Sequence, residues 1–361
     1  MGERQPAVEE VVKPQFWSGK KVLVTGHTGF KGAWLALWLS LLGARVSGYA
    51  LQPPSSPSLW AMIEAKAGIA STIADIRDLG ALAKAIESFQ PDIVFHLAAQ
   101  SLVRPSYDDP VGTYATNVMG TVHLLEAARR TASVRAVVNV TSDKCYENLE
   151  TGQAYRESDP MGGRDTYSSS KGCAELVTTA YRASFPGGAA IASARAGNVI
   201  GGGDWAQDRI VPDTVRAAVA GNAVQVRNPR AVRPWQHVLE PLAGYLQLAE
   251  RLHEAPAMFS EGWNFGPDED DAVPVEKVVS TITRLWGPPA SWAADKGTYP
   301  REAHFLKLDS SKARSRLGWK PRLGLQLALE WTVGWYKTQA QGADARHLTL
   351  AQIERYMGLA A

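Results

Sequence analysis

One stretch near the start of the sequence specifies the architecture: Lys21-Val22-Leu23-Val24-Thr25-Gly26-His27-Thr28-Gly29-Phe30-Lys31-Gly32. Its first five residues form an apolar run that predicts a buried strand, and its three glycines lead into an apolar helix that reaches Leu42. Here the first glycine allows a tight turn, the second lets backbone N–H groups approach a pyrophosphate, and the third lets helix and strand pack closely. The helix N-terminus also favours phosphate. A turn without a ligand is the alternative, but the strand–turn–helix context favours a bound dinucleotide.

Strand and helix patterns alternate after this stretch. Apolar runs predict further strands at 45–50, 69–74, 92–95 and 135–140. Helical patterns lie at 78–89 and 112–130. Such alternation predicts an α/β fold whose parallel sheet is covered by helices on both faces, and right-handed crossovers make it a doubly wound, Rossmann-type sheet.

The chain changes character beyond about residue 190, where glycines and prolines separate shorter elements. Helices are expected near 207–220, 238–253, 274–285 and 323–340. We therefore expect a dinucleotide-binding domain over 1–190 and a smaller C-terminal α/β substrate lobe over most of 191–361. The segment 234–260 is expected to return to the first domain, and residues 1–16 to be loosely held.

Composition excludes disordered proteins, collagen-like repeats and disulfide scaffolds. The 361 residues are 45% hydrophobic and 20% charged, with a net charge of +2, which is typical of a soluble globular protein. There is no basic tract, so no nucleic-acid partner is expected. The two cysteines and seven histidines lack metal-ligand spacing, so no metal site is expected. The longest apolar run is too short for a membrane span, and a cytoplasmic location is expected.

The usual ribose-binding acid is missing from the end of the second predicted strand. A carboxylate is expected about 20 residues after the glycine loop, but residues 47–51 contain none. The choice between NAD and NADP therefore stays open on the residues alone. Asp75, followed by Ile76, comes after the third predicted strand and could meet the adenine amino group. Its alternative role is a helix N-cap, which Asp78 could equally fill.

Tyr167 and Lys171 lie four residues apart, and so on one face of a helix. Tyr167 is the only one of the 11 tyrosines with a lysine at this offset. A neighbouring cation favours the phenolate and lowers its pKa, as an acid–base group acting on a carbinol requires. Solvated helix faces produce such pairs by chance, but the glycine loop makes the functional interpretation strong.

These motifs, with His96-Leu97-Ala98-Ala99 after a strand, resemble those of the extended short-chain dehydrogenase/reductases. Longer motifs resemble the CDP-glucose 4,6-dehydratase branch: Gly26 to Gly32, Thr141-Ser142-Asp143-Lys144-Cys145-Tyr146, Gly197-Asn198-Val199-Ile200-Gly201-Gly202-Gly203-Asp204-Trp205 and Arg233-Pro234-Trp235-Gln236-His237. The resemblance runs from about Trp17 to Trp335. It departs at Thr166, where proline is usual, and at Gln153-Ala154, and neither departure touches a reacting group.

The resemblance implies three stages that regenerate an NAD cofactor: oxidation of the sugar at C4, elimination of water across C5 and C6, and return of the hydride to C6. Tyr167 would remove the 4-hydroxyl proton, and Lys171 would tune Tyr167 and hold the nicotinamide ribose. Ser142 would hydrogen-bond O4, and Asp143 would protonate the departing 6-hydroxyl. The cofactor-binding residues would be Gly26, His27, Thr28, Gly29, Phe30, Gly32, Asp75, Ile76, Leu97, Ala98, Ala99, Asn117, Tyr167 and Lys171.

Lys144 marks a difference from the dTDP-glucose dehydratases, which have glutamate after the catalytic aspartate, a plausible base for C5. A charged ammonium cannot accept a proton, so Lys144 would need a depressed pKa to act as that base. We hypothesise that it does. The alternatives are that it stabilises an enolate while another group takes the proton, or that it is a surface lysine.

Arginines crowd one segment of the expected substrate lobe, at positions 209, 216, 227, 230 and 233. Arginine suits bidentate phosphate binding, so Arg233 and then Arg209 are the preferred ligands for a sugar-nucleotide pyrophosphate. Arg230 is expected to be a surface residue. Asn198 would bind the sugar nucleotide or form a turn. By resemblance alone, Arg104, Tyr107 and His304 would reach the sugar or base, while Asn117 would brace backbone near the site.

The resemblance implies NAD-dependent dehydration of CDP-D-glucose to CDP-4-dehydro-6-deoxy-D-glucose, for deoxysugar and O-antigen biosynthesis. Alternatives are an epimerase, a dehydratase for another nucleotide glucose, and a non-catalytic dinucleotide-binding regulator. An epimerase has no leaving hydroxyl for Asp143 to protonate, and the intact Tyr167–Lys171 pair disfavours a regulator. Helices near 112–130 and 165–185 resemble the pair that forms a four-helix dimer bundle, so a homodimer or dimer of dimers is expected.

Overall fold

Seven parallel strands form the central sheet, in the order β11-β6-β5-β4-β1-β2-β3. The computed structural model describes residues 11–295, 297 and 305–359. The strands are β1 (Lys21–Thr25), β2 (Arg45–Ala50), β3 (Ala70–Ile73), β4 (Ile93–His96), β5 (Ala136–Val140), β6 (Ala190–Arg195) and β11 (Gly262–Asn264). The chain order reverses on either side of β1, which confirms the predicted doubly wound α/β sheet.

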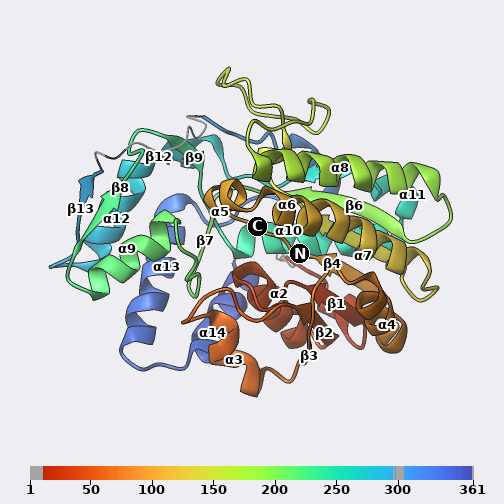
Figure 1. Cartoon of the computed structure of the whole chain (residues 1–361). Helices are drawn as coiled ribbons and strands as arrows, with labels where there is room; N and C mark the ends of the chain where they lie inside the picture. The colour runs from red at the N-terminus through yellow and green to blue at the C-terminus, as the bar shows by residue number, and fades with distance from the viewer. Residues whose placement is uncertain (1–10, 296, 298–304, 360–361) are drawn as a thin grey trace, which may run out of the picture.

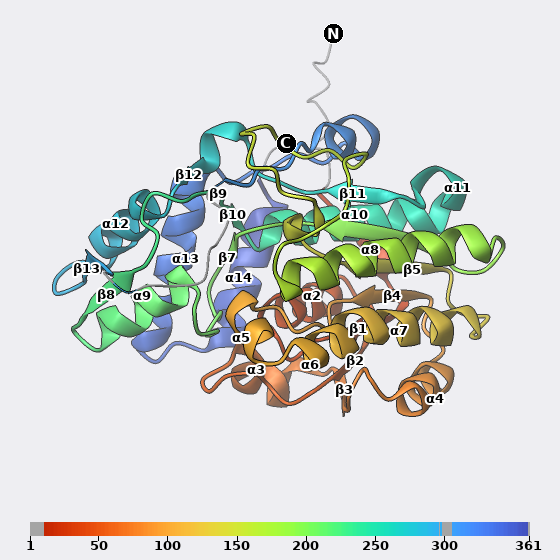
Figure 2. The same ribbon diagram turned by 45° about the horizontal axis from the view of Figure 1, so that its top comes forward.

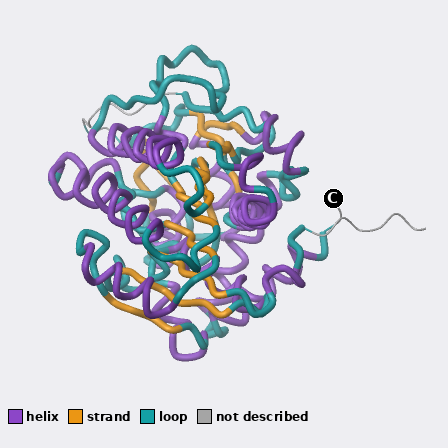
Figure 3. Tube along the Cα trace, turned by 90° about the vertical axis from the view of Figure 1, so that its right-hand side faces the viewer, coloured by secondary structure: helices purple, strands orange, loops and turns teal. Residues whose placement is uncertain are grey.

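Helices cover both faces of this sheet because its strands are apolar on both faces. Leu23, Val94 and Val137 point to one side, where they pack in one core cluster with residues of α4 and α7. The intervening residues, such as Val22 and Val24, point to the other side, toward α2 and α10. Figure 1 and Figure 3 show the strands lying between these two groups of helices. The bounds are α2 (Phe30–Leu41), α4 (Leu79–Phe89), α7 (Gly120–Arg129), α8 (Thr166–Ser184) and α10 (Leu239–Glu254).

Helix α2 is buried around most of its circumference, as its continuous apolar sequence predicts. Trp34 and Trp38, four residues apart, are both fully buried in the core. Trp34 Nε1 donates a hydrogen bond to the carbonyl of Gly202 at 2.9 Å, and Trp38 Nε1 lies 3.4 Å from the sulfur of Met357. Helix α2 is therefore fastened to two distant parts of the chain.

The expectation that residues 1–16 are loosely held is wrong for the part that the structure describes. Val11 and Val12 are buried, and the short helix α1 (Pro14–Trp17) ends in a fully buried tryptophan. Glu250 of α10 accepts hydrogen bonds from the Lys13 backbone N–H at 3.1 Å and from Trp17 Nε1 at 2.7 Å. Apolar burial and the buried Glu250 carboxyl thus hold residues 11–17 against α10.

In the described part of the chain, the smaller lobe contains three two-stranded sheets, β7 with β10, β9 with β12, and β8 with β13. It lies beside one end of the central sheet, at the left in Figure 1 and Figure 2. Its strands are β7 (Val199–Ile200), β8 (Ala223–Val226), β9 (Val232–Pro234), β10 (Gln236–His237), β12 (Ala272–Pro274) and β13 (Ser291–Ala294). Between these strands, α10 and β11 return to the central sheet. The division after residue 190 stays a prediction.

The remaining helices connect or cover these sheets. They are α3 (Leu59–Ala67), α5 (Val103–Asp108), α6 (Pro110–Tyr114), η1 (Ala115–Met119), η2 (Asp143–Cys145), α9 (Ile210–Val219), α11 (Pro256–Phe259), η3 (Glu269–Asp271), α12 (Val275–Trp286), η4 (Ala313–Leu317), α13 (Leu325–Ala340) and α14 (Ala345–Met357). Among the described residues, no helix combines the length and apolarity that a membrane crossing requires.

Candidate active site

A cavity of about 950 Å³ opens where the carboxyl ends of the central strands meet the smaller lobe. Ligands of doubly wound folds bind at such a position, beside the strand where the chain order reverses. The predicted site residues that line it are Gly26, Thr28, Gly29, Phe30, Gly32, Asp75, Ile76, Leu97, Ala98, Ala99, Arg104, Ser142, Asp143, Lys144, Tyr167, Lys171, Asn198, Arg209 and Arg233. Tertiary structure therefore gathers residues from many separate segments around one space.

The glycine loop has the close packing that its sequence predicts. Gly26 has a φ of +75°, and a Cβ there would lie 2.7 Å from the Ala98 nitrogen. A Cβ on Gly32 would lie 2.1 Å from the Gly26 carbonyl oxygen. Helix α2 begins after Gly29 without a side-chain cap, and its first residues line the cavity. These N-terminal N–H groups fit the pyrophosphate of a dinucleotide.

Asp75 lines the cavity, whereas Asp78 takes the capping role. The Asp78 side chain accepts a hydrogen bond from the Ala81 N–H and so caps α4. Asp75 forms an ion pair with Arg77 at 2.6 Å, and hydrogen bonding from Arg77 holds the pKa of the Asp75 carboxyl below its usual value. An ionised carboxylate at this wall suits a hydrogen-bond donor such as an adenine amino group.

Three predicted residues lie elsewhere, and a fourth is not described. The buried His27 ring packs against Gly48, and its Nε2 lies 2.7 Å from Ser71 Oγ. Asn117 is buried behind the cavity wall, where it hydrogen-bonds both the N–H and the carbonyl of Gln100 at 2.9 Å, so it braces backbone. Tyr107 is exposed on α5, outside the cavity lining. His304 lies outside the described residues.

Tyr167 and Lys171 lie in the first turns of α8, and both are buried. Burial raises the pKa of Tyr167 to about 12, with the Ser142 hydroxyl opposing it, and burial lowers the pKa of Lys171 to about 8. The pKa of Tyr167 is thus raised overall, and not lowered as the neighbouring cation predicts. The helical offset brings the two groups into one site, and removal of the phenol from water is the largest effect on its pKa.

The segment after β5 forms a tight turn that presents three predicted catalytic residues. Ser142 Oγ accepts a hydrogen bond from the Lys144 N–H at 3.2 Å and donates one to Asp143 Oδ1 at 3.0 Å. Asp143 is 2% exposed, and its Oδ2 has no hydrogen-bond partner within the described residues. Burial raises the pKa of this carboxyl, although nearby cations oppose the shift. Asp143 is thus suited to carry and donate a proton.

Gly197 makes room for that carboxyl. A Cβ at position 197 would lie 1.8 Å from Asp143 Oδ2, which is far inside contact distance. The glycine of the Gly197-Asn198 motif is therefore required for space, a role that the sequence alone did not reveal. Asn198 follows with a φ of +44° and lines the cavity.

Lys31 is a cavity-lining residue that the sequence interpretation left without a role. Burial lowers its pKa to about 7, helped by Arg209 and Lys171 and opposed by Asp143. It is the only Lys, Arg, Asp or Glu between Gly26 and Gly32. A charged residue in a loop that otherwise approaches a ligand through its backbone was the signal that could have identified it.

The arginine cluster divides into cavity-lining and structural members. Arg209 lines the cavity and pairs with Asp204 at 3.0 Å, and the buried Arg233 also lines it. Arg216 instead hydrogen-bonds the backbone carbonyls of Trp205 and Ala206. Arg104 and Arg227 both line the cavity and share Asp208, at 2.7 and 2.9 Å, whereas Arg230 is exposed outside the lining.

No group of three or more His, Cys, Asp or Glu side chains in the described ranges could hold a metal ion. The charged side chains that line the cavity are those of lysine, arginine and aspartate. They suit proton transfer and the binding of an anionic substrate.

Comparison with known proteins identifies the family. A family model described as GDP-mannose 4,6 dehydratase matches residues 23–331. The chain is 53% identical over 354 residues to CDP-glucose 4,6-dehydratase of Salmonella typhimurium (strain LT2), covering 96% of this chain and 99% of the relative.

Solved structures share the fold. The epimerase Mth375 of Methanothermobacter thermautotrophicus is 24% identical, with a TM-score of 0.79 over 92% of this chain and 96% of that one. UDP-glucose 4-epimerase of Thermus thermophilus, solved as a complex with NAD, is 25% identical, with a TM-score of 0.73 over 88% of this chain and 99% of that one. By the family match and the 53% identity, the chain belongs to the GDP-mannose 4,6 dehydratase family of extended short-chain dehydrogenase/reductases.

Proposed function

We propose that this chain is a hydro-lyase that dehydrates CDP-D-glucose to CDP-4-dehydro-6-deoxy-D-glucose with NAD as its cofactor. The observation that carries the proposal is the buried Asp143, whose pKa is raised, in the same cavity as Tyr167 and Lys171. Elimination of water needs an acid for the departing hydroxyl, whereas epimerisation does not. The 53% identity to a CDP-glucose 4,6-dehydratase supports cytosine as the nucleotide base of the substrate.

The cavity residues fit NAD. The glycine loop and the first turn of α2 would hold its pyrophosphate, Asp75 and Ile76 its adenine end, and residues 97–99 its central part. Lys171 would hold the nicotinamide ribose. When bound, NAD supplies the oxidant that C4 requires and, in its reduced form, the reductant that C6 requires.

The Tyr167–Lys171 pair performs the first proton transfer. Tyr167 accepts the proton of the sugar 4-hydroxyl, and the Lys171 cation favours the phenolate while it does so. Burial raises the pKa of Tyr167 to about 12, so the phenol must first give up its own proton before the phenolate can act as this base. The Ser142 hydroxyl, whose hydrogen is donated to Asp143 Oδ1 in the structure, would turn to donate its hydrogen bond to O4, where negative charge develops.

Asp143 and a cavity lysine then carry out the elimination. The ketone at C4 acidifies the C5 hydrogen, an amine accepts that proton, and Asp143 donates its own proton to the departing 6-hydroxyl. We assign the C5 base to Lys144, which lines the cavity beside Asp143. Lys31 is the second candidate, because its pKa of about 7 gives it a substantial neutral fraction near pH 7.

Two matched variants identify the C5 base. Lys144→Met is expected to retain C4 oxidation, seen as NADH absorbance, while stopping elimination and deuterium exchange at C5. Lys31→Met removes the other amine and is expected to retain exchange. Normal turnover by Lys144→Met would remove that residue from the mechanism, and loss of exchange only in Lys31→Met would transfer the role to Lys31.

Cations of the smaller lobe would bind the substrate. Arg233 and Arg209 are proposed to hold the pyrophosphate, since both line the cavity and arginine binds phosphate through two parallel hydrogen bonds. Asn198 and Arg104, also in the wall, are proposed to contact the sugar nucleotide. The net charge of +2 is small, so these local cations would supply the attraction for the anionic substrate.

A homodimer, or a dimer of two such dimers, is part of the proposal. Figure 1 and Figure 2 show α6, α7 and α8 side by side on the outside of the molecule. Exposed apolar side chains on α6, on α8 and on η1, which joins α6 to α7, support a contact there: Val111 is 78% exposed, Leu176 61% and Met119 47%. Leu176→Arg should convert the dimer to a monomer in sedimentation, and a monomeric unmodified protein would refute the dimer. The product would serve deoxysugar and O-antigen synthesis in the cytoplasm.

The central experiment incubates the protein with CDP-glucose and NAD and follows the alkaline absorbance of a 4-keto-6-deoxy sugar. Parallel incubations with dTDP-, GDP- and UDP-glucose test the base preference. The expected result is product from CDP-glucose at the highest kcat/KM. An altered sugar without alkaline absorbance would indicate epimerisation, and no conversion of any substrate would favour a non-catalytic protein.

A further inference from the structure

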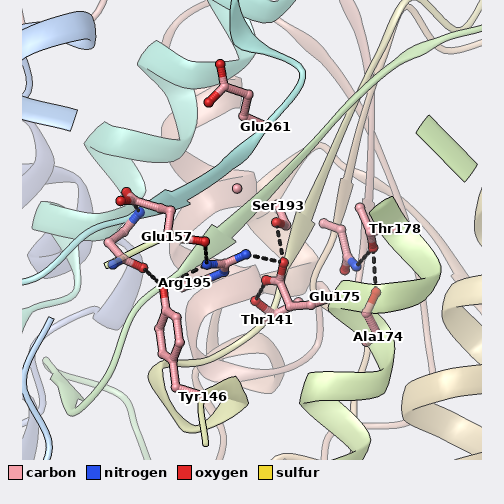
Figure 4. A network of polar contacts seen from close by, with 12 residues as sticks. Thr141, Tyr146, Glu157, Ala174, Glu175, Thr178, Ser193, Arg195 and Glu261 are labelled. Carbon is pink, nitrogen blue, oxygen red and sulfur yellow. Dashed lines mark hydrogen bonds and ion pairs between the residues drawn. The ribbon is translucent and has the colours of Figure 1, made fainter. Parts of the chain in front are cut away.

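The turn that bears Ser142, Asp143 and Lys144 is held by a hydrogen bond at each end, and both hydrogen bonds are made with the same ion pair. Thr141, just before the turn, donates a hydrogen bond from Oγ1 to Glu175 Oε1 at 2.5 Å. Tyr146, just after it, accepts a hydrogen bond from Arg195 Nη1 at 2.7 Å. Arg195 Nη2 and Glu175 Oε2 lie 2.7 Å apart. Figure 4 shows these four side chains converging from separate elements.

This ion pair is buried and has further polar partners. The Arg195 and Glu175 side chains are 5% and 2% exposed. Glu175 also accepts a hydrogen bond from Ser193 Oγ at 2.6 Å, and the Tyr146 hydroxyl donates to Asn264 Oδ1 at 2.7 Å. Burial opposes ionisation of Glu175, but Arg195 and these hydrogen bonds hold the pKa of Glu175 below its usual value. The pair thus stays charged and links α8, β5, β6 and β11.

The same carboxylate acts on the other half of the site. Glu175 lies one helical turn after Lys171 on α8, so both side chains point from one face of the helix toward the sheet. Burial lowers the pKa of Lys171, and the negative charge of Glu175 is the largest effect that opposes this shift. One ion pair therefore contacts the residues flanking the turn and also influences Lys171.

We propose that the Glu175–Arg195 pair is a positioning element that holds the turn bearing Ser142, Asp143 and Lys144 in register with Tyr167 and Lys171 on α8. Without both hydrogen bonds, the Asp143 carboxyl and the Tyr167 phenol would lose the relative position that lets them act on one sugar. A misplacement of about 1 Å can cost on the order of 100-fold in rate. The inference rests on the proposed function for its catalytic consequence, but the anchoring of the turn is testable without it.

The test removes one anchor and leaves the ion pair in place. Thr141→Val deletes the hydroxyl and keeps the volume, Thr141→Ser keeps the hydroxyl, and Tyr146→Phe deletes the second anchor. Thr178→Val is the matched control, because Thr178 Oγ1 accepts a hydrogen bond from Asn139 at 2.8 Å and also bridges β5 and α8, one turn farther from the site. All four variants are compared by thermal unfolding and by calorimetric binding of CDP.

Thr141→Val and Tyr146→Phe are expected to lower kcat by about 10- to 100-fold, with KM changed less than about threefold and CDP binding retained. Thr141→Ser should restore most of the loss, and Thr178→Val should keep kcat despite a similar loss of stability. A kcat in Thr141→Val equal to that of Thr178→Val, or no rescue by serine, would overturn the positioning role.

Amide hydrogen exchange of the peptide over 141–146 supplies a readout that needs no turnover. Exchange there should be about tenfold faster in Thr141→Val and Tyr146→Phe than in the unmodified protein or in Thr178→Val. Unchanged exchange would overturn the anchoring itself. An unmodified protein that dehydrates no nucleotide glucose, yet shows the exchange difference, would overturn the proposed function and leave the anchor established.

Discussion

Two buried carboxyl groups near the end of β5 behave in opposite ways. Glu175 and Asp143 are each 2% exposed. Glu175 faces Arg195, and the pKa of its carboxyl is lowered despite burial. Asp143 Oδ2 has no partner in the described part of the chain, and burial raises the pKa of this carboxyl. The first group is suited to holding structure and the second to carrying a proton.

Two further carboxyls on α10 show what decides whether the pKa of a buried carboxyl is raised or lowered. Glu250 accepts hydrogen bonds from Trp17 and Lys13 N–H groups, and Glu240 from two backbone N–H groups and the Tyr356 hydroxyl. Burial raises the pKa of each to about 7. Hydrogen bonds from neutral donors do not hold a buried carboxyl ionised, whereas the guanidinium at Glu175 does. A guanidinium in direct hydrogen-bond contact, as at Glu175, therefore outweighs burial, whereas neutral donors and more distant cations do not.

Asp143→Asn should produce the largest effect, because it removes the proton donor and keeps the Oδ1 contact with Ser142. Turnover of CDP-glucose is expected to fall on the order of 1,000-fold, measured as product formation. The free energy of unfolding should change by less than about 1 kcal/mol, because no charged partner is lost. Turnover within tenfold of the unmodified protein would contradict the assignment of Asp143 as the acid.

Glu175→Gln tests the opposite member of the comparison. Neutralising Glu175 leaves Arg195 charged and buried, so the free energy of unfolding should fall by about 3 kcal/mol. Urea denaturation measures this change. A loss below about 1 kcal/mol would show that the pair contributes no more than a surface ion pair, and the contrast with Asp143 would then fail.

Gly197→Ala sharpens the comparison by moving the Asp143 carboxyl without changing its chemistry. The new Cβ would lie 1.8 Å from Oδ2, so the carboxyl must shift. Elimination is expected to slow by about 100-fold, measured by product formation and by C5 deuterium exchange.

The matched control is Gly334→Ala, at an exposed position of α13 where a Cβ meets nothing within 4 Å. It should keep full activity and gain up to about 1 kcal/mol of stability, because alanine favours a helix. If Gly197→Ala is equally active, the carboxyl does not need its observed position.

Glu250→Gln tests a buried carboxyl whose hydrogen-bond donors are neutral N–H groups, and it has the smallest expected effect. The folded pKa of about 7 lies above the ordinary value of 4.5, so protonated Glu250 favours folding below pH 4.5. This contribution is lost as the pH rises through 7, and the unmodified protein should lose on the order of 2 kcal/mol relative to the variant.

Urea denaturation from about pH 4.5 to 8 measures the slope. The control is Glu64→Gln, at an exposed position of α3, and the change in slope should appear in Glu250→Gln only. Identical slopes for Glu250→Gln and the unmodified protein would refute the raised pKa.

Local patterns made much of the fold and site predictable. The alternation of apolar runs and helical stretches predicted the parallel sheet, and the glycine spacing predicted the turn before α2 because each glycine meets backbone within a few residues or on the next strand. The four-residue offset placed Tyr167 and Lys171 in one cavity. The same reasoning missed the docking of residues 11–17, because Glu250, which holds them, lies more than 230 residues away along the chain.

The sequence by itself determined the features that depend on short periods: the doubly wound sheet, the glycine turn and the one-sided Tyr167–Lys171 pair. Only the tertiary structure decided the electrostatics. It turned the His27 ring away from the cavity, left Asp143 buried beside Gly197 and raised the pKa of Tyr167 instead of lowering it. The physical reason is that a pKa depends on burial and on charged partners, and folding brings these from positions that are distant in the sequence.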